Sequence, residues 1–98
     1  MHAVKRIEVL VDSVELTKIL TGLDQAGVPG HTVIRNVVGR SPGADATQLD
    51  NVYVIAFCLP EQAKQVVENI RPILNKFGGA CYISDAMEIR SVRCVASL

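Results

Sequence analysis

Two apolar runs, Thr32–Val38 and Asn51–Leu59, lie on either side of a polar segment rich in Gly, Pro and Asp. The second run is apolar at both its odd and its even positions, where Val52, Val54, Ala56 and Cys58 alternate with Tyr53, Ile55, Phe57 and Leu59. Successive side chains of a β-strand point to opposite faces, so a strand without a polar face has to be covered on both sides. A chain of 98 residues can cover one face with its own helices, and we expect another subunit to cover the other.

The residues before these runs predict a strand followed by a helix. Val4–Val11 alternates imperfectly and is rich in β-branched residues, as strands are. Asp12 or Ser13 is then expected to cap a helix, and Glu15 stands where a capping box returns a hydrogen bond. Apolar residues recur at helical spacing from there through Ala26.

The second half of the chain predicts a hairpin followed by another helix. A strand is expected over about His31–Gly39, a loop over Arg40–Asp50, and the next strand over Asn51–Leu59. A second amphipathic helix is then expected to run from Pro60, which suits a first helical turn, to Phe77.

This second helix contains a conflict at Pro72. A proline inside a helix removes one hydrogen bond, so we expect a kink or an interruption near Arg71. Two glycines are expected to end the helix, and Ala80–Met87 is expected to form the last strand. Glu88–Val95 is expected to extend that strand or to form a short extra one.

The order strand, helix, strand, strand, helix, strand predicts an α+β, ferredoxin-like fold. In that fold an antiparallel four-stranded sheet carries both helices on one face. We expect a single domain over residues 1–98, because the sequence contains neither an interdomain linker nor an internal repeat. The uncovered sheet face would receive the second apolar row of the strand Asn51–Leu59, so the domain is expected to assemble through that face.

Composition narrows the possible partners. Ten basic and ten acidic residues cancel, so nothing favours binding to nucleic acid or to an anionic membrane. No apolar run approaches the ~20 residues of a membrane span, and no signal-peptide core follows the first residues, so we expect a cytoplasmic protein. Cys58, Cys81 and Cys94 fit buried thiols, and their spacing predicts no metal site. The sequence leaves open whether Cys81 and Cys94 form a disulfide.

No catalytic constellation is present: the sequence lacks a P-loop, a nucleophile elbow and a paired-histidine metal motif. We therefore expect a protein that is not an enzyme. Three features are suited to an anion: the turn Gly27–Thr32, the backbone amides of Gly78-Gly79, and the pair Arg90 and Arg93. Each is more often structural when taken alone, as is a turn residue such as His31. Together they suggest one shared site.

The sequence KRIEVLVDSVELTKILTGLDQAGVPGHTVIRNVVGRS resembles the first half of the PII signal-transduction superfamily. The matching residues are Gly30, Thr32 and Val33, with Gly39-Arg40 opening the long loop. The sequence NVYVIAFCLPEQAKQVVENIRPILNKFGGACYISDAMEIRS is similar in layout to the third strand, second helix, glycine-bearing B-loop and fourth strand of that family. The resemblance covers nearly the whole chain.

This resemblance implies a homotrimer that binds adenine nucleotides at the clefts between its subunits. It places Gly30 and Thr32 near the base and ribose, and Gly39 and Arg40 at the base of the long loop. It also implies phosphate contacts, which would come from Gly78, Gly79, Arg90 and Arg93.

The chain departs from typical nitrogen-regulator members at two places. The loop lacks the Gln-Lys-Gly start and the modifiable tyrosine, and Tyr53 lies in the following strand instead. Ala80 and Cys81 stand where a B-loop lysine would follow the glycines. These departures argue against 2-oxoglutarate sensing, Mg-ATP sensing and uridylylation. The chain is more similar to the carboxysome-associated and bicarbonate-transporter-associated PII-like proteins, which sense AMP, ADP or cyclic AMP and in some cases bicarbonate.

The leading hypothesis is therefore a non-enzymatic trimeric regulator with no obligatory cofactor. Its adenine nucleotide would alter the order of the loop Arg40–Asp50, which would signal to a target transporter or enzyme. Without a B-loop lysine we favour nucleotides with fewer phosphates, and for a bicarbonate ligand we select Arg40 as the cation. The alternatives are an ACT-like or CutA-like trimer that binds a small molecule or a metal, and a structural subunit without a ligand.

Overall fold

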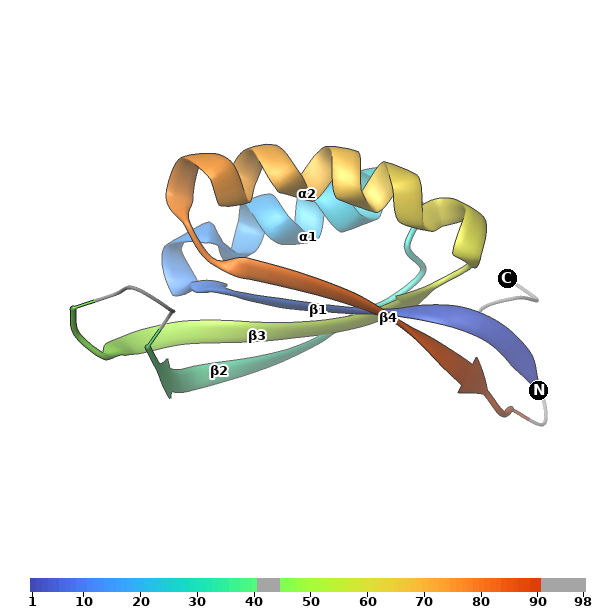
Figure 1. The fold of residues 1–98 in the computed structure, drawn as a ribbon, viewed down its shortest axis with the longest axis horizontal. Helices are drawn as coiled ribbons and strands as arrows, with labels where there is room; N and C mark the ends of the chain where they lie inside the picture. Colours follow the sequence, from blue (N-terminus) through green and yellow to red (C-terminus); the bar gives the residue numbers. More distant parts are fainter. Residues whose placement is uncertain (41–44, 91–98) are drawn as a thin grey trace.

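The computed structural model describes residues 1–40 and 45–90 of the chain. The strands form one antiparallel sheet in the order β2-β3-β1-β4, and both helices cover the same face of it (Figure 1). The elements are β1 (His2–Asp12), the 3₁₀ turn η1 (Ser13–Glu15), α1 (Leu16–Gln25), β2 (Thr32–Gly39), β3 (Gln48–Cys58), the 3₁₀ turn η2 (Pro60–Gln62), α2 (Ala63–Phe77) and β4 (Ala80–Glu88). The predicted α+β, ferredoxin-like fold is confirmed.

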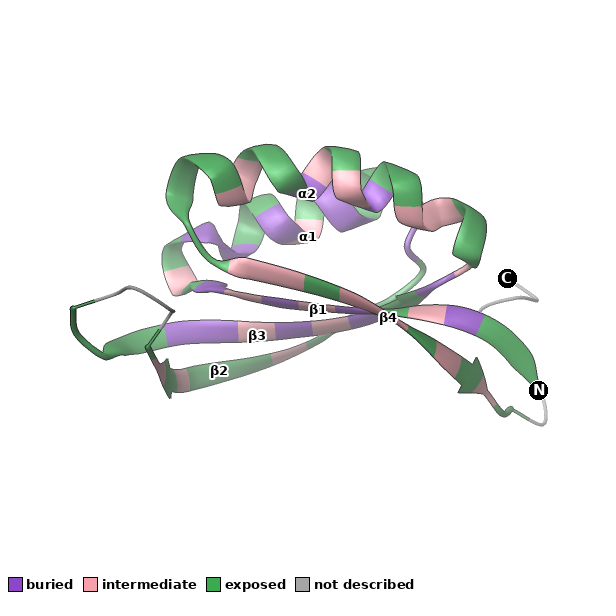
Figure 2. Cartoon of the chain, in the orientation of Figure 1, coloured by how far each residue is buried: buried purple, intermediate pink, exposed green. Residues whose placement is uncertain are grey.

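The hydrophobic core lies between the sheet and its two helices. Figure 2 shows the buried residues on the central strands and on the sides of the helices that face them. In the ladder between β1 and β3, fully buried side chains pair as Ile7 with Ala56, Val9 with Val54, and Val11 with Val52. The helices contribute Ile19, Leu23, Val66 and Ile70 to the same cluster. Burying each of these large aliphatic side chains stabilises the fold by roughly 1.5–3 kcal/mol.

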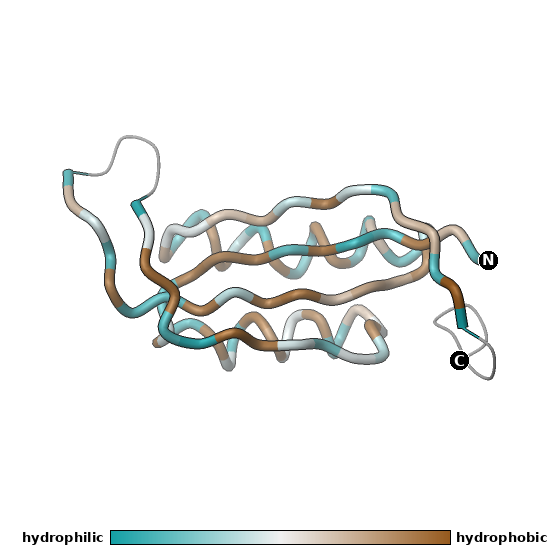
Figure 3. The backbone as a smooth tube through the Cα atoms, turned by 90° about the horizontal axis from the view of Figure 1, so that it is seen from below, coloured by the Kyte–Doolittle hydropathy of each residue, from teal (hydrophilic) through white to brown (hydrophobic). Residues whose placement is uncertain are grey.

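The opposite face of the sheet carries no helix, as the view from that side shows (Figure 3). Apolar residues that alternate with the core residues point to this side and are exposed or only partly buried. We call this surface the open face; its apolar residues are Leu10, Ile34, Tyr53, Ile55, Phe57 and Tyr82. Phe57 is 37% exposed and Tyr82 is 63% exposed. The second apolar row of the strand predicted over Asn51–Leu59 therefore lies where the sequence predicted, on the face that the helices leave uncovered.

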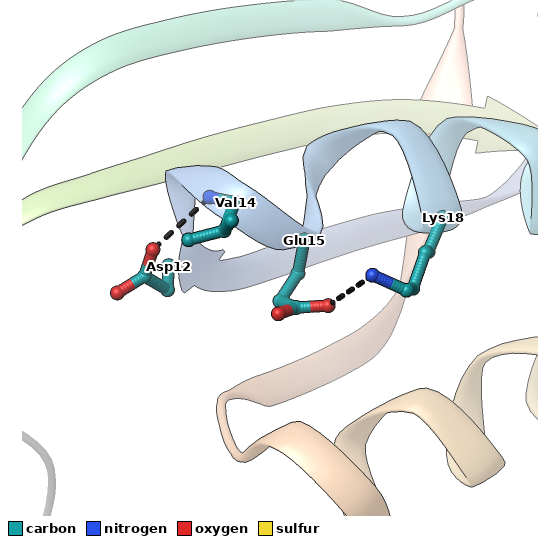
Figure 4. Close-up of polar contacts among 4 residues, drawn as sticks. All are labelled: Asp12, Val14, Glu15 and Lys18. Carbon is teal, nitrogen blue, oxygen red and sulfur yellow. Dashed lines mark hydrogen bonds and ion pairs between the residues drawn. The ribbon is translucent and has the colours of Figure 1, made fainter.

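Asp12, one of the two predicted capping residues, caps the first helical segment. The Asp12 carboxylate accepts a hydrogen bond from the backbone N–H of Val14 at 3.0 Å (Figure 4). The expected return contact from Glu15 is replaced by a different one. The Glu15 carboxylate accepts a hydrogen bond from the Lys18 ammonium at 3.0 Å, one helical turn further on.

Of the two outcomes expected near Pro72, a kink or an interruption, the interruption is wrong. Helix α2 continues without a break from Ala63 to Phe77, with the proline in its interior. Pro72 is exposed, whereas Val66 and Ile70 of the same helix are buried against the core. Packing of the apolar stripe thus holds the helix together across the missing hydrogen bond.

The boundaries of the hairpin also differ from the expected ones. Strand β3 begins at Gln48 rather than Asn51, because Gln48 pairs with Gly39 at the end of β2. The pairing changes register between Ile34 and Val37, and Asn36 has a φ of 60° there. Such a bulge bends the strand and locally interrupts the ladder, which then continues to the pair of Gly39 with Gln48.

Strand β4 ends at Glu88, close to the expected end. The extra strand considered for Glu88–Val95 falls mostly outside the described residues. In the described part of the chain, no helix is long and apolar enough to cross a membrane.

Candidate functional site

A cavity of about 390 Å³ opens where the α1–β2 turn meets the end of β4. We call it cavity one; it is lined by Pro29, Gly30, His31, Thr32, Ile55, Ala56, Phe57, Glu88 and Arg90. It brings together three of the predicted site residues: Gly30, Thr32 and Arg90. The half-exposed ring of Phe57 gives it an apolar wall. The cavity therefore combines an apolar ring with a hydroxyl, the cation of Arg90 and the carboxylate of Glu88.

A second cavity of about 260 Å³ lies at the other end of the sheet. We call it cavity two; it is lined by Leu10, Val11, Asp12, Gly39, Arg40, Gln48, Asn51, Phe77, Gly78 and Gly79. It contains the four predicted residues of the loop base and of the B-loop. Arg40 supplies its cationic group and Asp12 its anionic group.

The two cavities are separate within one chain. Thr32 and Gly39 stand at opposite ends of β2, and Gly79 and Arg90 flank opposite ends of β4. An eight-residue strand spans roughly 25 Å, so these groups lie too far apart to surround one small ligand. The residues expected to share one site are thus divided between two cavities of one chain. Arg93 lies outside the described residues.

The two glycines that end α2 have different roles. Gly79 has a φ of 101°, and a Cβ placed on it would lie 2.7 Å from both the carbonyl oxygen of Leu10 and Cγ1 of Val11. Gly78 has a φ of 84° but no atom within 4 Å of the Cβ position, so it faces open space. Its N–H donates to the carbonyl of Leu74 at 2.8 Å and closes the helix. A ligand anion at this loop must therefore find its donors elsewhere than at the amide of Gly78.

Two lysines contact the ring of Phe77, which lines cavity two. The Lys18 ammonium lies 4.6 Å from the ring centroid and the Lys76 ammonium lies 5.3 Å from it. Glu15, which is 9% exposed, fixes Lys18 in this place. Two ammonium groups thus lie beside the glycine loop although the loop itself has no lysine, and one of them, that of Lys18, is paired with Glu15.

Sequence reasoning missed several lining residues of both cavities. Phe57 and Phe77 were assigned only to the apolar patterns of a strand and a helix, and Asn51 only to the start of a strand. A polar residue at the start of an otherwise apolar run is a weak signal of a cavity-lining position, and Asn51 was such a residue.

The described cysteines are free thiols in apolar surroundings. Burial raises the pKa of Cys58, and the charge of Glu61 adds to that effect. Burial raises the pKa of Cys81 to about 11. Cys94, and with it the pairing considered for Cys81, lies outside the described residues. Within residues 1–40 and 45–90 no three His, Cys, Asp or Glu side chains gather as metal ligands would.

The chain matches the family model described as Nitrogen regulatory protein P-II over residues 4–93. Because this match covers most of the chain, the protein belongs to the P-II family. Its short loop and lysine-free glycine motif make it a divergent, PII-like member. The assignment separates it from the ACT-like and CutA-like alternatives, which share its topology. The search of curated proteins found no match.

Solved structures of PII proteins superpose on this chain. CPII of Thiomonas intermedia bound to ADP, AMP and acetate is 22% identical with a TM-score of 0.82, and the match covers 91% of each chain. CPII bound to ADP and bicarbonate is 21% identical with a TM-score of 0.78, covering 87% of each chain. The B. subtilis GlnK–ATP complex is 14% identical with a TM-score of 0.66, covering 86% of this chain and 82% of GlnK. These likenesses show the shared fold.

Proposed function

We propose that this protein is a non-enzymatic regulator that binds an adenine nucleotide between the subunits of a homotrimer. The observation that carries the proposal is the division of the predicted ligand residues between two cavities at opposite ends of one chain. A head-to-tail interface brings different ends of neighbouring subunits together. Cavity one of one subunit and cavity two of the next would then form one complete cleft.

The chemistry of the two cavities suits the parts of a nucleotide. The Phe57 ring and the Thr32 hydroxyl of cavity one fit a base and a ribose, and Arg90 fits a phosphate. Arg40 and the glycine loop of cavity two fit the phosphate end of the same ligand. The likeness to CPII, whose structures contain ADP, AMP and bicarbonate, supports AMP or ADP as the ligand and bicarbonate as an additional one. Cyclic AMP stays a further candidate from the sequence resemblance.

We propose that segment 40–50, which starts at a residue of cavity two, carries the signal to a target transporter or enzyme. A ligand that binds one arrangement of this segment more tightly than another shifts the balance between them. We expect the protein to act in the cytoplasm as one domain.

Calorimetric titration with AMP, ADP, ATP and cyclic AMP, each with and without bicarbonate, tests the binding. We expect the nucleotides with one or two phosphates to bind more tightly than ATP. Arg90→Ala and Arg40→Ala should each weaken binding at least about tenfold, as removal of a hydrogen bond to a charged group does. If the unmodified protein binds no adenine nucleotide at millimolar concentration, the proposal fails.

Mixing the two variants tests whether the cleft is shared between subunits. If each cleft takes cavity one and cavity two from different chains, random exchange of subunits restores about a quarter of the clefts to full affinity. If the site lay within one chain, every chain of the mixture would stay defective. The same two variants mixed after chemical cross-linking of the trimers provide the control without exchange.

A further inference from the structure

Asn51 lies at an unusual place for a polar side chain. It begins the apolar part of β3, is 3% exposed, and still lines cavity two. In the sheet it is paired with Asp12 of β1 and with Val37 of β2, directly after the bulge in the β2 ladder. Its side chain thus meets the cavity at the point where the sheet changes register.

The hydrogen-bonding groups of this amide are poorly used within the chain. An asparagine amide has two N–H donors and an oxygen that accepts twice. The Asn51 amide nitrogen donates to the carbonyl of Gln48 at 3.4 Å, a distance at the long limit of such bonds. Among the described residues no group donates to its oxygen. Every fully enclosed side-chain nitrogen or oxygen in the described part of the chain has a hydrogen-bond partner. The Asn51 oxygen has no donor, so it is not fully enclosed, and Asn51 lines cavity two.

The other polar groups of the cavity indicate what would satisfy the amide. Arg40 contributes a positive charge. The Asp12 carboxylate already accepts a hydrogen bond from the N–H of Val14, which fixes it as a helix cap. The Asn51 oxygen is accessible and has no donor among the described residues, so it is open to a donor from a ligand in cavity two.

We propose that Asn51 binds the anionic end of the ligand, with its amide on an oxygen of a phosphate or of bicarbonate beside Arg40. This inference rests on the proposed function and assigns to it a specificity-determining residue. An amide donates to an ionised oxygen and accepts from a protonated one. A lysine can only donate. Bicarbonate and a singly protonated phosphate carry both kinds of oxygen, so Asn51 favours these over fully ionised anions.

The test compares Asn51→Asp and Asn51→Leu with the unmodified protein. Asn51→Asp keeps the shape but opposes an anion, and Asn51→Leu removes all hydrogen bonds at similar volume. Asn75→Asp is the matched control, because it makes the same charge change on an exposed position of α2 outside cavity two. The measurements are calorimetric titrations with AMP and ADP, a titration of the ADP-saturated protein with bicarbonate, and thermal unfolding of each variant.

We expect Asn51→Asp to weaken anion binding by tenfold or more and Asn75→Asp to leave it unchanged. A loss for ADP that exceeds the loss for AMP assigns Asn51 to the terminal phosphate. A loss confined to bicarbonate assigns it to that ion. We expect Asn51→Leu to lose binding while keeping its melting temperature, since the amide serves the ligand rather than the fold.

Two results would overturn the assignment separately from the proposed function. Nucleotide and bicarbonate binding that is unchanged in both Asn51 variants would refute the role of Asn51 and leave the regulator standing. A melting temperature lowered equally by both substitutions, with binding reduced only in proportion to unfolding, would make Asn51 purely structural. If the unmodified protein binds neither nucleotide nor bicarbonate, both proposals fail together.

Discussion

Adjacent residues of the same type can be required for different reasons, and Gly78 and Gly79 illustrate this. Both have positive φ values, which other residues adopt at a cost. Only Gly79 also lies against the backbone of β1, so a side chain there meets an oxygen that cannot move aside. Gly78 borders open space in cavity two. The conformational requirement is shared, whereas the steric one belongs to Gly79 alone.

Gly79→Ala is therefore expected to destabilise the protein more than Gly78→Ala. We expect a loss of about 3 kcal/mol or more for Gly79→Ala, from left-handed strain plus steric overlap with β1. For Gly78→Ala we expect about 1–3 kcal/mol from strain alone, because its φ of 84° and ψ of -176° belong to a region that essentially only glycine adopts. Urea unfolding of both variants measures the difference. Equal losses would show that the close approach to Leu10 has no energetic weight.

The raised pKa of Cys81 predicts a pH dependence of stability. Its pKa moves from an ordinary 9.0 to about 11 because burial disfavours the thiolate. The folded protein thus binds this proton more tightly than the unfolded chain. The resulting stability is fully present below about pH 9 and is lost as the pH rises through about 11.

Cys81→Ala tests this titration, since it removes the thiol with little change in shape. The free energy of unfolding should fall more steeply for the unmodified protein than for the variant between pH 9 and pH 11. Cys58, whose pKa burial also raises, is present in both proteins and cancels in the comparison. Parallel curves over that range would rule out a partly buried, neutral Cys81 as the cause.

At the scale of elements, tertiary packing decides where local propensity conflicts with pattern. The apolar stripe of α2 predicts one helix and Pro72 predicts a kink or an interruption, and the helix continues without interruption. Val66 and Ile70 on its inner side are fully buried, while the proline faces solvent. The missing hydrogen bond therefore destabilises the helix locally, and the packing of its apolar side offsets this loss.

Pro72→Ala is expected to stabilise the protein. It restores a donor in the helix interior and removes a steric conflict, worth up to about 3 kcal/mol in helices, less about 1 kcal/mol because the unfolded chain becomes more flexible. We expect a net gain of about 1–2 kcal/mol in chemical unfolding. Lys64→Ala, at an exposed position of the same helix, should be nearly neutral. A destabilised Pro72→Ala would mean that the proline shapes α2 in a way the core requires.

Periodicity was enough to predict the order of elements and both faces of β3, because burial imposes those patterns directly. It could not predict that β3 starts at Gln48, since that residue is polar and is held by its partner Gly39. Gly30, Gly78, Gly79 and Arg90 were recognisable by residue type, whereas Gly39 and Arg40 were predicted from the family resemblance. Asn51 and Phe57 were predicted from neither, because their roles depend on which strand end reaches which cavity. That information lies in the topology and not in any local stretch of sequence.

At the scale of the whole molecule, the sheet is covered on one face only. The open face carries large apolar side chains, among them Ile34 at 47% and Tyr82 at 63% exposure. It also carries the ion pair between Arg6 and Glu8, at 2.9 Å. Contiguous apolar surface with a few charges is typical of an interface between subunits. Both cavities include residues of this face, so assembly and ligand binding should depend on each other.

A charge placed on the open face should therefore separate the subunits and abolish nucleotide binding together. Ile34→Glu and Tyr82→Glu add a carboxylate at positions exposed in the single chain, so folding should survive while packing against a partner would bury an unpaired charge. We expect light scattering to give three times the 10.6 kDa of one chain for the unmodified protein, and one chain for the variants. Gln65→Glu, at an exposed position of α2 on the other face of the sheet and outside both cavities, is the control and should stay trimeric. A monomeric variant that still binds ADP with full affinity would place the site within one chain and refute the shared cleft.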